Sequence, residues 1–234
     1  MSIKHAMILA AGLGRRMNPI TLKTPKPLIK LGEKNLLERA IDLLINHGVE
    51  EIAINVHHLS HQIKDFINDK KYKVKFRISD EQNTLLDTGG GIFEATKSFN
   101  KPFIVINPDT VWNTNYLNEL KILEDLYFEQ KKICLLLVDK NLSFDDTFKG
   151  DFNLNSNIVS RDDNNELIFT GLQILDQSVF KNIKDKIFSM NKIWDHLIKD
   201  KSLLGLQSKQ KFYHLNSKEM YDKMLKLKIT DLGL

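Results

Sequence analysis

The first half of the chain alternates between two patterns of apolar and polar positions, one typical of strands and one typical of helices. Four short segments have the pattern of strands, at 3–9, 51–56, 74–79 and 103–107. The segments between them repeat apolar residues at three- and four-residue spacing, as one face of a helix does, at 36–46, 61–68 and 88–99. Strands that alternate with helices favour a parallel sheet with helices on both faces.

The second half of the chain departs from this alternation. Short strand-like segments and polar turns between residues 145 and 170 predict an antiparallel hairpin that covers one side of the ligand site. The other expected elements are a helix at 115–131, a strand at 133–138, a helix at 191–201, strands at 203–207 and 211–215, and a helix at 218–228. We find no repeat or linker. The pattern therefore predicts one domain over residues 1–234, a three-layer α/β/α, Rossmann-like fold with a mixed, mostly parallel sheet.

Composition limits what kind of protein this chain can be. Its 234 residues, 42% of them hydrophobic and 27% charged, fit a globular domain. A net charge of +4 is too small to indicate a nucleic-acid partner. No apolar run approaches the length of about 18 residues that a membrane span needs. The one cysteine, Cys134, excludes an internal disulfide, and the N-terminus lacks a signal-peptide pattern. We therefore expect a cytoplasmic monomer or small homo-oligomer.

The first strand ends in a run of small residues. After Leu9 come Ala10, Ala11, Gly12 and, one residue later, Gly14. Glycine allows a positive φ and a close approach of the backbone, and successive N–H groups in such a turn form an anion-binding concavity. We therefore predict that these two alanines and two glycines bind the phosphates of a nucleotide.

Two cations follow this loop. Arg16 comes soon after the glycines, and Lys26 stands between two prolines. Arginine neutralises phosphate as a flat fork and lysine as a point charge, so both are predicted catalytic residues. A Walker loop would place Gly-Lys-Ser/Thr where Gly14 is followed by Arg15. An NAD-binding oxidoreductase is disfavoured because Met17 takes the place of a small residue and no acidic residue ends a second strand at the required spacing.

These residues resemble the signature of a known family. Residues 9–17 together with the Thr-Pro-Lys-Pro-Leu run at 24–28 resemble the sugar-1-phosphate nucleotidyltransferases, and 86–93 and 169–171 resemble a short branch of that family. The similarity covers nearly the whole chain. It implies that a nucleoside triphosphate and a sugar 1-phosphate give a nucleoside-diphosphate sugar and pyrophosphate, with Mg²⁺ as cofactor and Mn²⁺ as a possible substitute. The branch implies UTP and N-acetylmuramate 1-phosphate, substrates of cell-wall recycling.

A run of three glycines, 89–91, opens the helix expected at 88–99. Glycine in a helix interior costs about 1 kcal/mol relative to alanine, so the run indicates that something approaches the backbone closely. Tight packing of the helix and contact with a nucleoside both explain it. The resemblance implies the second, with Leu85, Gly89 and Gly90 beside the nucleoside.

Asp109 follows the strand expected at 103–107, where its carboxylate would face the phosphate loop. Carboxylate oxygens suit Mg²⁺, and the resemblance makes Asp109 a metal ligand. A second metal-binding aspartate of many relatives corresponds here to His214, a softer ligand better suited to Zn²⁺ or Mn²⁺. This departure leaves three alternatives: a metal held by Asp109, water and phosphates; a changed metal preference; or weakened activity.

The resemblance also implies contacts with the sugar phosphate from Asp151, Thr170 and Gly171, although a turn role explains Asp151 equally well. Two other functions stay open. One is the same chemistry with other substrates, such as mannose 1-phosphate and GTP. The other is a catalytically weak regulatory or nucleotide-binding subunit, which His214 suggests. The presence of Arg16, Lys26 and Asp109 together favours an enzyme.

Overall fold

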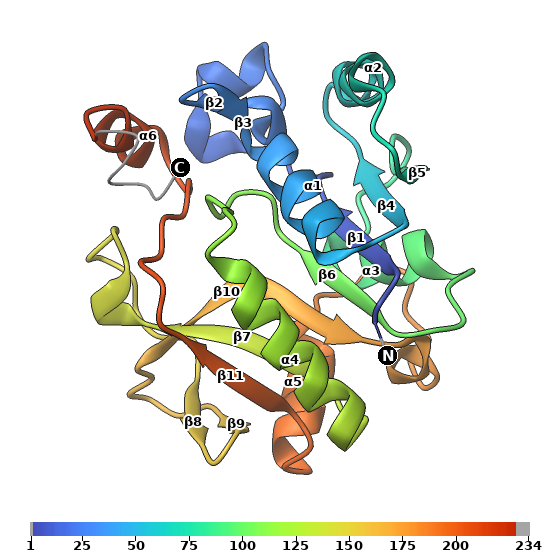
Figure 1. Ribbon diagram of the computed structural model, residues 1–234, viewed down its shortest axis with the longest axis vertical. Helices are drawn as coiled ribbons and strands as arrows, with labels where there is room; N and C mark the ends of the chain where they lie inside the picture. The colour runs from blue at the N-terminus through green and yellow to red at the C-terminus, as the bar shows by residue number, and fades with distance from the viewer. Residues whose placement is uncertain (1, 228–234) are drawn as a thin grey trace.

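Among residues 2–227, which the computed structural model describes, nine strands form one sheet through the centre of the molecule (Figure 1). Their order is β5-β4-β1-β6-β10-β7-β11-β9-β8. The strands are β1 (His5–Leu9), β4 (Glu51–Val56), β5 (Lys75–Asp80), β6 (Phe103–Ile106), β7 (Cys134–Asp139), β8 (Asn153–Asn155), β9 (Ile158–Ser160), β10 (Leu167–Leu175) and β11 (Leu204–Ser208). Two further short strands, β2 (Lys30–Leu31) and β3 (Lys34–Asn35), pair only with each other.

The sheet is mixed, as predicted. Strand β1 runs parallel to β4 and β6, and β4 runs parallel to β5. Strand β10 lies antiparallel between β6 and β7, whereas β11 is parallel to β7. The predicted hairpin is formed by β8 and β9, which extends the sheet beyond β11. The carboxyl ends of β5, β4, β1 and β6 therefore meet at one edge.

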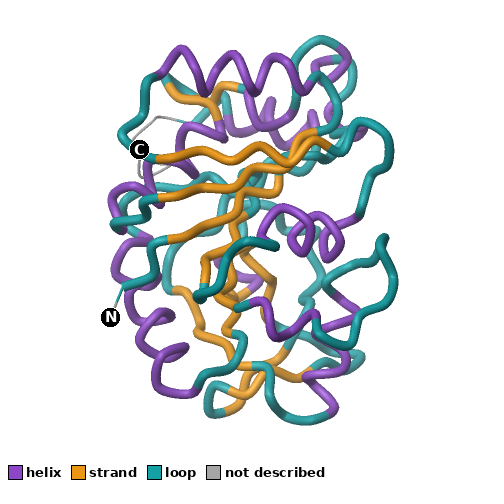
Figure 2. Tube along the Cα trace, turned by 90° about the vertical axis from the view of Figure 1, so that its right-hand side faces the viewer, coloured by secondary structure: helices purple, strands orange, loops and turns teal. Residues whose placement is uncertain are grey.

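Helices cover both faces of the sheet, as Figures 1 and 2 show. They are α1 (Leu36–His47), α2 (Ser60–Lys70), α3 (Asp87–Thr96), α4 (Tyr116–Gln130), α5 (Asn191–Lys199) and α6 (Lys218–Met224). Side chains alternate between the two faces of a strand. In β1, Ala6 and Ile8 pack in the cluster that contains α1, α2 and α4, whereas Met7 packs in the cluster with α3 and α5. The three-layer prediction is therefore confirmed.

Local signals set several helix ends. The Asn35 side chain accepts a hydrogen bond from the Glu38 N–H at 2.7 Å, and Gly48 ends α1 with φ of 100°. Ser217 accepts from the Met220 N–H at 3.2 Å and begins α6. The prediction that Ser60 caps its helix is wrong, because Leu59 occupies the cap position and Ser60 is already helical. The last helix ends at Met224, and the predicted end at residue 228 lies outside the described residues.

Three other expectations need correction. The strand predicted at 211–215 is an extended segment that makes only isolated bridges, Ser143 with Phe212 and Thr110 with His214. It crosses the end of the sheet instead of joining a ladder. Strand β10 continues well beyond 167–169, because a bulge between Phe169 and Leu172 lets it pair with β7 on both sides of the irregularity. The loop predicted at 10–32 contains three short 3₁₀ helices, Arg15–Met17, Ile20–Leu22 and Lys26–Leu28.

One simpler expectation agrees with the structure. Cys134 is buried in β7, and burial raises the pKa of its thiol to about 12. Within residues 2–227 we find no helix with the length and apolar character to cross a membrane.

Candidate active site

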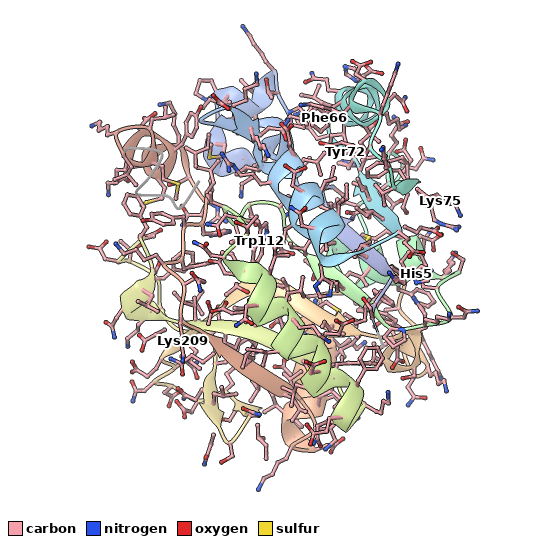
Figure 3. All side chains as sticks on the ribbon, viewed as in Figure 1. His5, Phe66, Tyr72, Lys75, Trp112 and Lys209 are labelled. Carbon is pink, nitrogen blue, oxygen red and sulfur yellow. The ribbon has the colours of Figure 1, made fainter. Side chains whose placement is uncertain are left out.

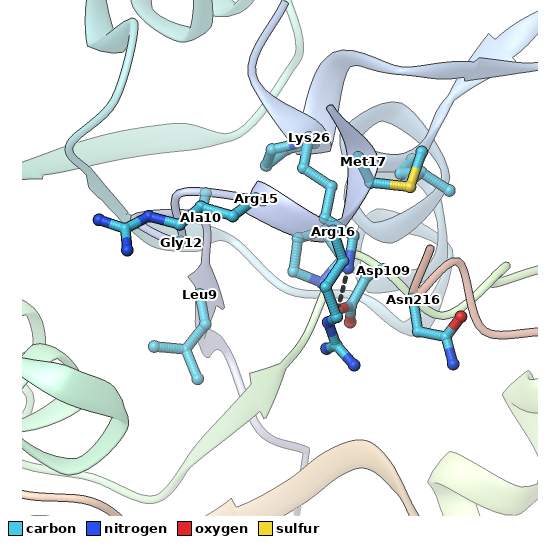
Figure 4. Close-up of a pocket in the computed structure, with 13 residues that line it drawn as sticks. Leu9, Ala10, Gly12, Arg15, Arg16, Met17, Lys26, Asp109 and Asn216 are labelled. Carbon is cyan, nitrogen blue, oxygen red and sulfur yellow. Dashed lines mark hydrogen bonds and ion pairs between the residues drawn. The ribbon is translucent and has the colours of Figure 1, made fainter. Parts of the chain in front are cut away.

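A pocket of about 290 Å³ opens at the edge where the parallel strands end, and we call it the loop pocket. The loop after β1 and the loop after β6 form most of it (Figure 4). Its lining includes Gly12, Gly14, Arg16, Lys26, Asp109 and Asn216. The predicted convergence of the phosphate loop, the two cations and the carboxylate is therefore observed.

The two glycines of the loop differ in what surrounds them. Gly14 has φ of +62°, and a Cβ there would lie 2.9 Å from Thr21 Cγ2 and 3.2 Å from Lys26 Cβ. Thr21 Oγ1 also donates to the Gly14 carbonyl oxygen at 3.0 Å. At Gly12 an added Cβ meets no atom of the described residues within 4 Å. Gly14 is thus required by the fold of the loop, whereas Gly12 leaves open space at the pocket.

Asp109 lines the loop pocket and contacts two basic side chains. Its Oδ2 accepts a hydrogen bond from Lys26 Nζ at 2.7 Å and lies 3.1 Å from His214 Nε2. Burial works to raise the pKa of Asp109, but the neighbouring Lys26 and His214 outweigh burial and hold that pKa well below its usual range. The carboxylate is therefore ionised and available to a cation.

The two arginines of the loop are free cations. Arg15 and Arg16 are exposed, and neither forms an ion pair within the part of the chain that the structure describes. In Figure 4 their side chains point in different directions, and both residues line the loop pocket. Arg16 is thus placed to receive the charge of a ligand in the pocket.

The pocket offers oxygen atoms of the kind that a hard cation needs. Asp109 Oδ1 and Asn216 Oδ1 are both buried and have no hydrogen-bond partner among the described residues. No group of three or more His, Cys, Asp or Glu residues in 2–227 could hold a metal ion alone. Mg²⁺ commonly keeps waters and substrate phosphates as ligands, so this small donor set fits it. His214, the second predicted ligand, is next to Asp109 but directs Nε2 at the Asp109 carboxylate itself.

Hydrogen bonds from other segments hold the loop after β6 in place. Trp112, labelled in Figure 3 beside the start of α4, is fully buried, and its Nε1 donates to the Asn107 carbonyl oxygen at 2.7 Å. The Val111 N–H donates to the Tyr213 carbonyl and the Leu215 N–H to the Asp109 carbonyl, both at 2.8 Å. These bonds fix Asp109 against the segment that carries His214 and Asn216.

A second pocket of about 230 Å³ adjoins the first and shares Gly12 and Asp109 with it. Ala11 and Leu85 line it, and the Leu85 side chain is 38% exposed. Ala10 lines the loop pocket, although its N–H is taken up by Asn55 Oδ1 at 2.8 Å. The second pocket is suited to a flat, partly apolar group attached to phosphates in the loop pocket.

Two residues of this second pocket escaped the sequence analysis. Asn55 Nδ2 donates to Glu81 Oε1 at 2.7 Å, and Glu81 Oε2 accepts from the Leu86 N–H at 2.9 Å. With the bond from Ala10 to Asn55, this chain of contacts ties the loop after β1 to the start of α3. The signal in the sequence was a polar residue, Asn55, at the end of an otherwise apolar strand.

The glycines at the start of α3 do not line either pocket. A Cβ at Gly89 would overlap the Phe188 ring, and a Cβ at Gly90 would overlap the Lys186 carbonyl oxygen. The Gly90 N–H also donates to the Phe188 carbonyl at 3.0 Å. The glycine run does allow a close approach to its backbone, but the approaching atoms belong to Lys186 and Phe188 and not to a ligand. Thr88 and Asp87, just before the glycines, line the second pocket instead.

A third pocket of about 220 Å³ lies beside β10, and we call it the side pocket. Its lining includes the predicted residue Asp151, together with Arg161, Trp194 and His214. Arg161 donates to Asp195 at 2.7 Å and lies 4.6 Å from the centre of the Phe152 ring. The sequence analysis did not single out Arg161 or Trp194 for a site, because neither belongs to a motif.

Thr170 and Gly171, predicted to bind the sugar phosphate, do not line the side pocket. Thr170 is 1% exposed, and its hydroxyl donates to the Leu136 carbonyl at 2.8 Å. Gly171 has φ of +92°, and a Cβ there would lie 2.8 Å from Asn107 Cβ. Both residues shape the bulge of β10 against Asn107, so the structure gives them a structural role.

Comparison with known proteins decides the family. The family model described as nucleotidyl transferase matches residues 5–142, more than half of the chain. The chain belongs to this family. It is 30% identical over 223 residues to N-acetylmuramate alpha-1-phosphate uridylyltransferase of Caulobacter vibrioides, with 91% of each chain covered. It is 34% identical over 184 residues to the enzyme of the same name in Neisseria meningitidis, covering 76% of this chain and 78% of that one.

Solved structures agree with the family. The crystal structure of HddC from Yersinia pseudotuberculosis complexed with GMP-PN is similar with a TM-score of 0.75 and 25% identity, covering 96% of this chain and 99% of that one. A UDP-glucose pyrophosphorylase complexed with UDP-glucose has the same TM-score of 0.75 at 21% identity and covers 95% and 97% of the two chains, which supports the fold. This nucleotidyl transferase is thus an enzyme of the sugar-1-phosphate nucleotidyltransferase class.

Proposed function

We propose that this nucleotidyl transferase joins UTP to N-acetylmuramate 1-phosphate and releases pyrophosphate. The observation that carries the chemistry is the meeting of Arg16, Lys26 and Asp109 around the glycine loop in one pocket. The substrate pair is supported by the names of two relatives that are 30% and 34% identical to this chain. A UTP-dependent reaction of this kind also agrees with the expected cytoplasmic location.

The three pockets suggest how the substrates lie. In this proposal the nucleoside occupies the second pocket, beside Leu85, and its phosphates follow the open backbone at Gly12 into the loop pocket. The sugar occupies the side pocket, where Asp151 and Trp194 offer a hydrogen-bond acceptor and an aromatic surface. His214 lines the side pocket and contacts Asp109, so the sugar phosphate would enter the loop pocket past this pair.

The reaction then needs positioning and charge rather than a base. A phosphate oxygen of the sugar 1-phosphate attacks the α-phosphorus, a new P–O bond forms, and the bond to pyrophosphate breaks. That oxygen is already ionised at neutral pH, so no proton has to be removed. Arg16 stabilises the leaving pyrophosphate, and Lys26 binds the α-phosphate or the sugar phosphate. Asp109 would hold Mg²⁺, which when bound neutralises phosphate charge.

A second substrate pair has a specific observation in its favour. The chain is 33% identical over 137 residues to D-glycero-alpha-D-manno-heptose 1-phosphate guanylyltransferase of Campylobacter jejuni, which covers 58% of each chain. The similar HddC structure was solved with GMP-PN, a guanine nucleotide. We therefore keep GTP with a heptose or mannose 1-phosphate as the alternative pair.

Pyrophosphate release distinguishes these pairs. Each of UTP, GTP, CTP, dTTP and ATP is mixed with Mg²⁺ and one sugar 1-phosphate, of the muramate, glucosamine, mannose, heptose or glucose type. We expect release with UTP and N-acetylmuramate 1-phosphate. Release only with GTP would keep the chemistry and replace the substrates. If no mixture released pyrophosphate, with Mg²⁺ or with Mn²⁺, this result would contradict the proposed activity and support the regulatory-subunit alternative.

A further inference from the structure

Two residues that line the loop pocket each carry a buried oxygen atom without a hydrogen-bond partner among the described residues. Asp109 Oδ1 and Asn216 Oδ1 are buried and accept no hydrogen bond within residues 2–227. Both residues line the same pocket, and the Leu215 N–H donates to the Asp109 carbonyl at 2.8 Å, which joins their two segments. Figure 4 draws both side chains among the residues that line the pocket. A buried acceptor without a partner is costly, so a ligand is expected to complete the pair.

Asn216 is held in one orientation. Its Nδ2 donates to Asp145 Oδ2 at 2.7 Å. The other oxygen of Asp145 already accepts two hydrogen bonds, from the Thr147 N–H at 3.0 Å and the Thr147 hydroxyl at 2.6 Å. A carboxylate only accepts hydrogen bonds, so the amide NH₂ group must face Asp145. The amide oxygen of Asn216 therefore faces away from Asp145, as the unpartnered atom.

A phosphate cannot complete this pair directly. Phosphate oxygens and the Asp109 and Asn216 oxygens are all hydrogen-bond acceptors, so contact between them is repulsive unless a cation stands between them. Carboxylate and amide oxygens are ligands that Mg²⁺ and Mn²⁺ prefer.

His214 is less suited to be the second ligand. Its ring stacks on Phe212, with centroids 5.8 Å apart and planes inclined by 9°, and it lies 5.5 Å from the Phe148 ring. It lines the side pocket and directs Nε2 at Asp109 Oδ2. Asn216, two residues later in the same extended segment, lines the pocket that also contains Arg16 and Lys26.

We propose that Asp109 Oδ1 and Asn216 Oδ1 are the two protein ligands of the divalent cation, and that Asp145 is a positioning residue that orients the Asn216 amide. This inference rests on the proposed function for its choice of cation. In this proposal Asn216, and not His214, is the second metal ligand. His214 instead contacts Asp109 beside the proposed sugar site.

Binding of Mn²⁺ alone tests the proposal without any turnover. Mn²⁺ is titrated into the full chain, and free Mn²⁺ is measured by electron paramagnetic resonance. Asp145→Asn should weaken binding about tenfold, the usual cost of losing an outer-shell partner, and Asn216→Ala by more. The matched control is Asn155→Ala, which changes an exposed asparagine in β8 and should bind Mn²⁺ like the unchanged chain.

Pulsed resonance spectra of bound Mn²⁺ give a second readout. Two oxygen ligands predict no coupling from a directly coordinated nitrogen, whereas ligation by His214 predicts an imidazole nitrogen signal. That signal, unchanged binding in Asn216→Ala, or no binding by the unchanged chain would each overturn the proposal. Circular dichroism and the melting temperature check that every variant is folded. Because no substrate is involved, Mn²⁺ binding can succeed while the substrate tests fail, and the reverse.

Discussion

Two glycine-rich segments follow strands in this enzyme, and their surroundings differ. At Gly12, after β1, an added Cβ would meet no atom within 4 Å, whereas at Gly90, in the first turn of α3, it would overlap the carbonyl oxygen of Lys186. Gly12 lines two pockets and Gly90 lines neither. The first segment keeps space for a ligand, and the second lets one part of the protein pack on another. A glycine run by itself therefore does not distinguish binding from packing.

The largest expected effect comes from the cation that the first segment presents. Arg16→Ala should lower turnover about 100- to 1000-fold, the usual loss when one group that stabilises transition-state charge is removed. Its stability should not change, because Arg16 is exposed and makes no ion pair within residues 2–227. Steady-state pyrophosphate release and thermal melting measure both quantities.

Arg15→Ala is the matched control for this variant. Arg15 is the same type of residue at the adjacent position and also lines the loop pocket, but its side chain points in another direction in Figure 4. It should lower turnover far less than Arg16→Ala. Equal losses in the two variants would show that general positive charge, rather than the position of Arg16, matters.

Gly90→Ala tests the second segment. The added methyl group must push the Lys186 backbone away from α3, and overpacking of this kind costs about 1 to 3 kcal/mol. Urea unfolding should show this loss of stability. A variant as stable as the unchanged protein would remove the packing explanation for the glycine run.

Gly14→Ala should have a smaller and mixed effect. The position has φ of +62°, and a left-handed backbone costs a non-glycine residue about 1 to 2 kcal/mol. The new methyl group would also press on Thr21 and on Lys26 Cβ, so turnover should fall together with stability. A loss of stability with unchanged turnover per folded molecule would contradict the expected link between Gly14 and the position of Lys26.

Gly12→Ala should have the smallest effect on stability. No atom of residues 2–227 opposes the methyl group, so the melting temperature should stay unchanged. The KM for the nucleotide should rise, because the methyl group occupies space that the proposal gives to the ligand. An unchanged KM would place the nucleotide elsewhere.

Much of the fold could be predicted because its signals are local. Apolar runs located β1, β4 and β6, and Asn35, Gly48 and Ser217 marked helix ends by bonds to their own neighbours. The loop pocket could also be anticipated, since its main residues belong to one motif or directly follow a strand. This is why Gly12, Arg16, Lys26 and Asp109 were found together.

The remaining features depend on partners far away in the sequence. The sequence around Gly89 does not indicate that Phe188 packs on it. The sequence around Thr170 does not indicate that its hydroxyl donates to the Leu136 carbonyl. The extended run around Phe212 has the pattern of a strand, but its neighbours offer only isolated bridges. Long-range packing therefore decided which motif residues line a pocket and which support it.

A single competition experiment tests the central claim most directly. The enzyme receives equal amounts of UTP, GTP, CTP, dTTP and ATP with Mg²⁺ and a mixture of sugar 1-phosphates that includes N-acetylmuramate 1-phosphate, and mass spectrometry identifies the products. We predict UDP-N-acetylmuramate as the main product, formed together with pyrophosphate. Pyrophosphate with a different nucleoside-diphosphate sugar would contradict the proposed substrates, and the absence of every such sugar would contradict the proposed activity.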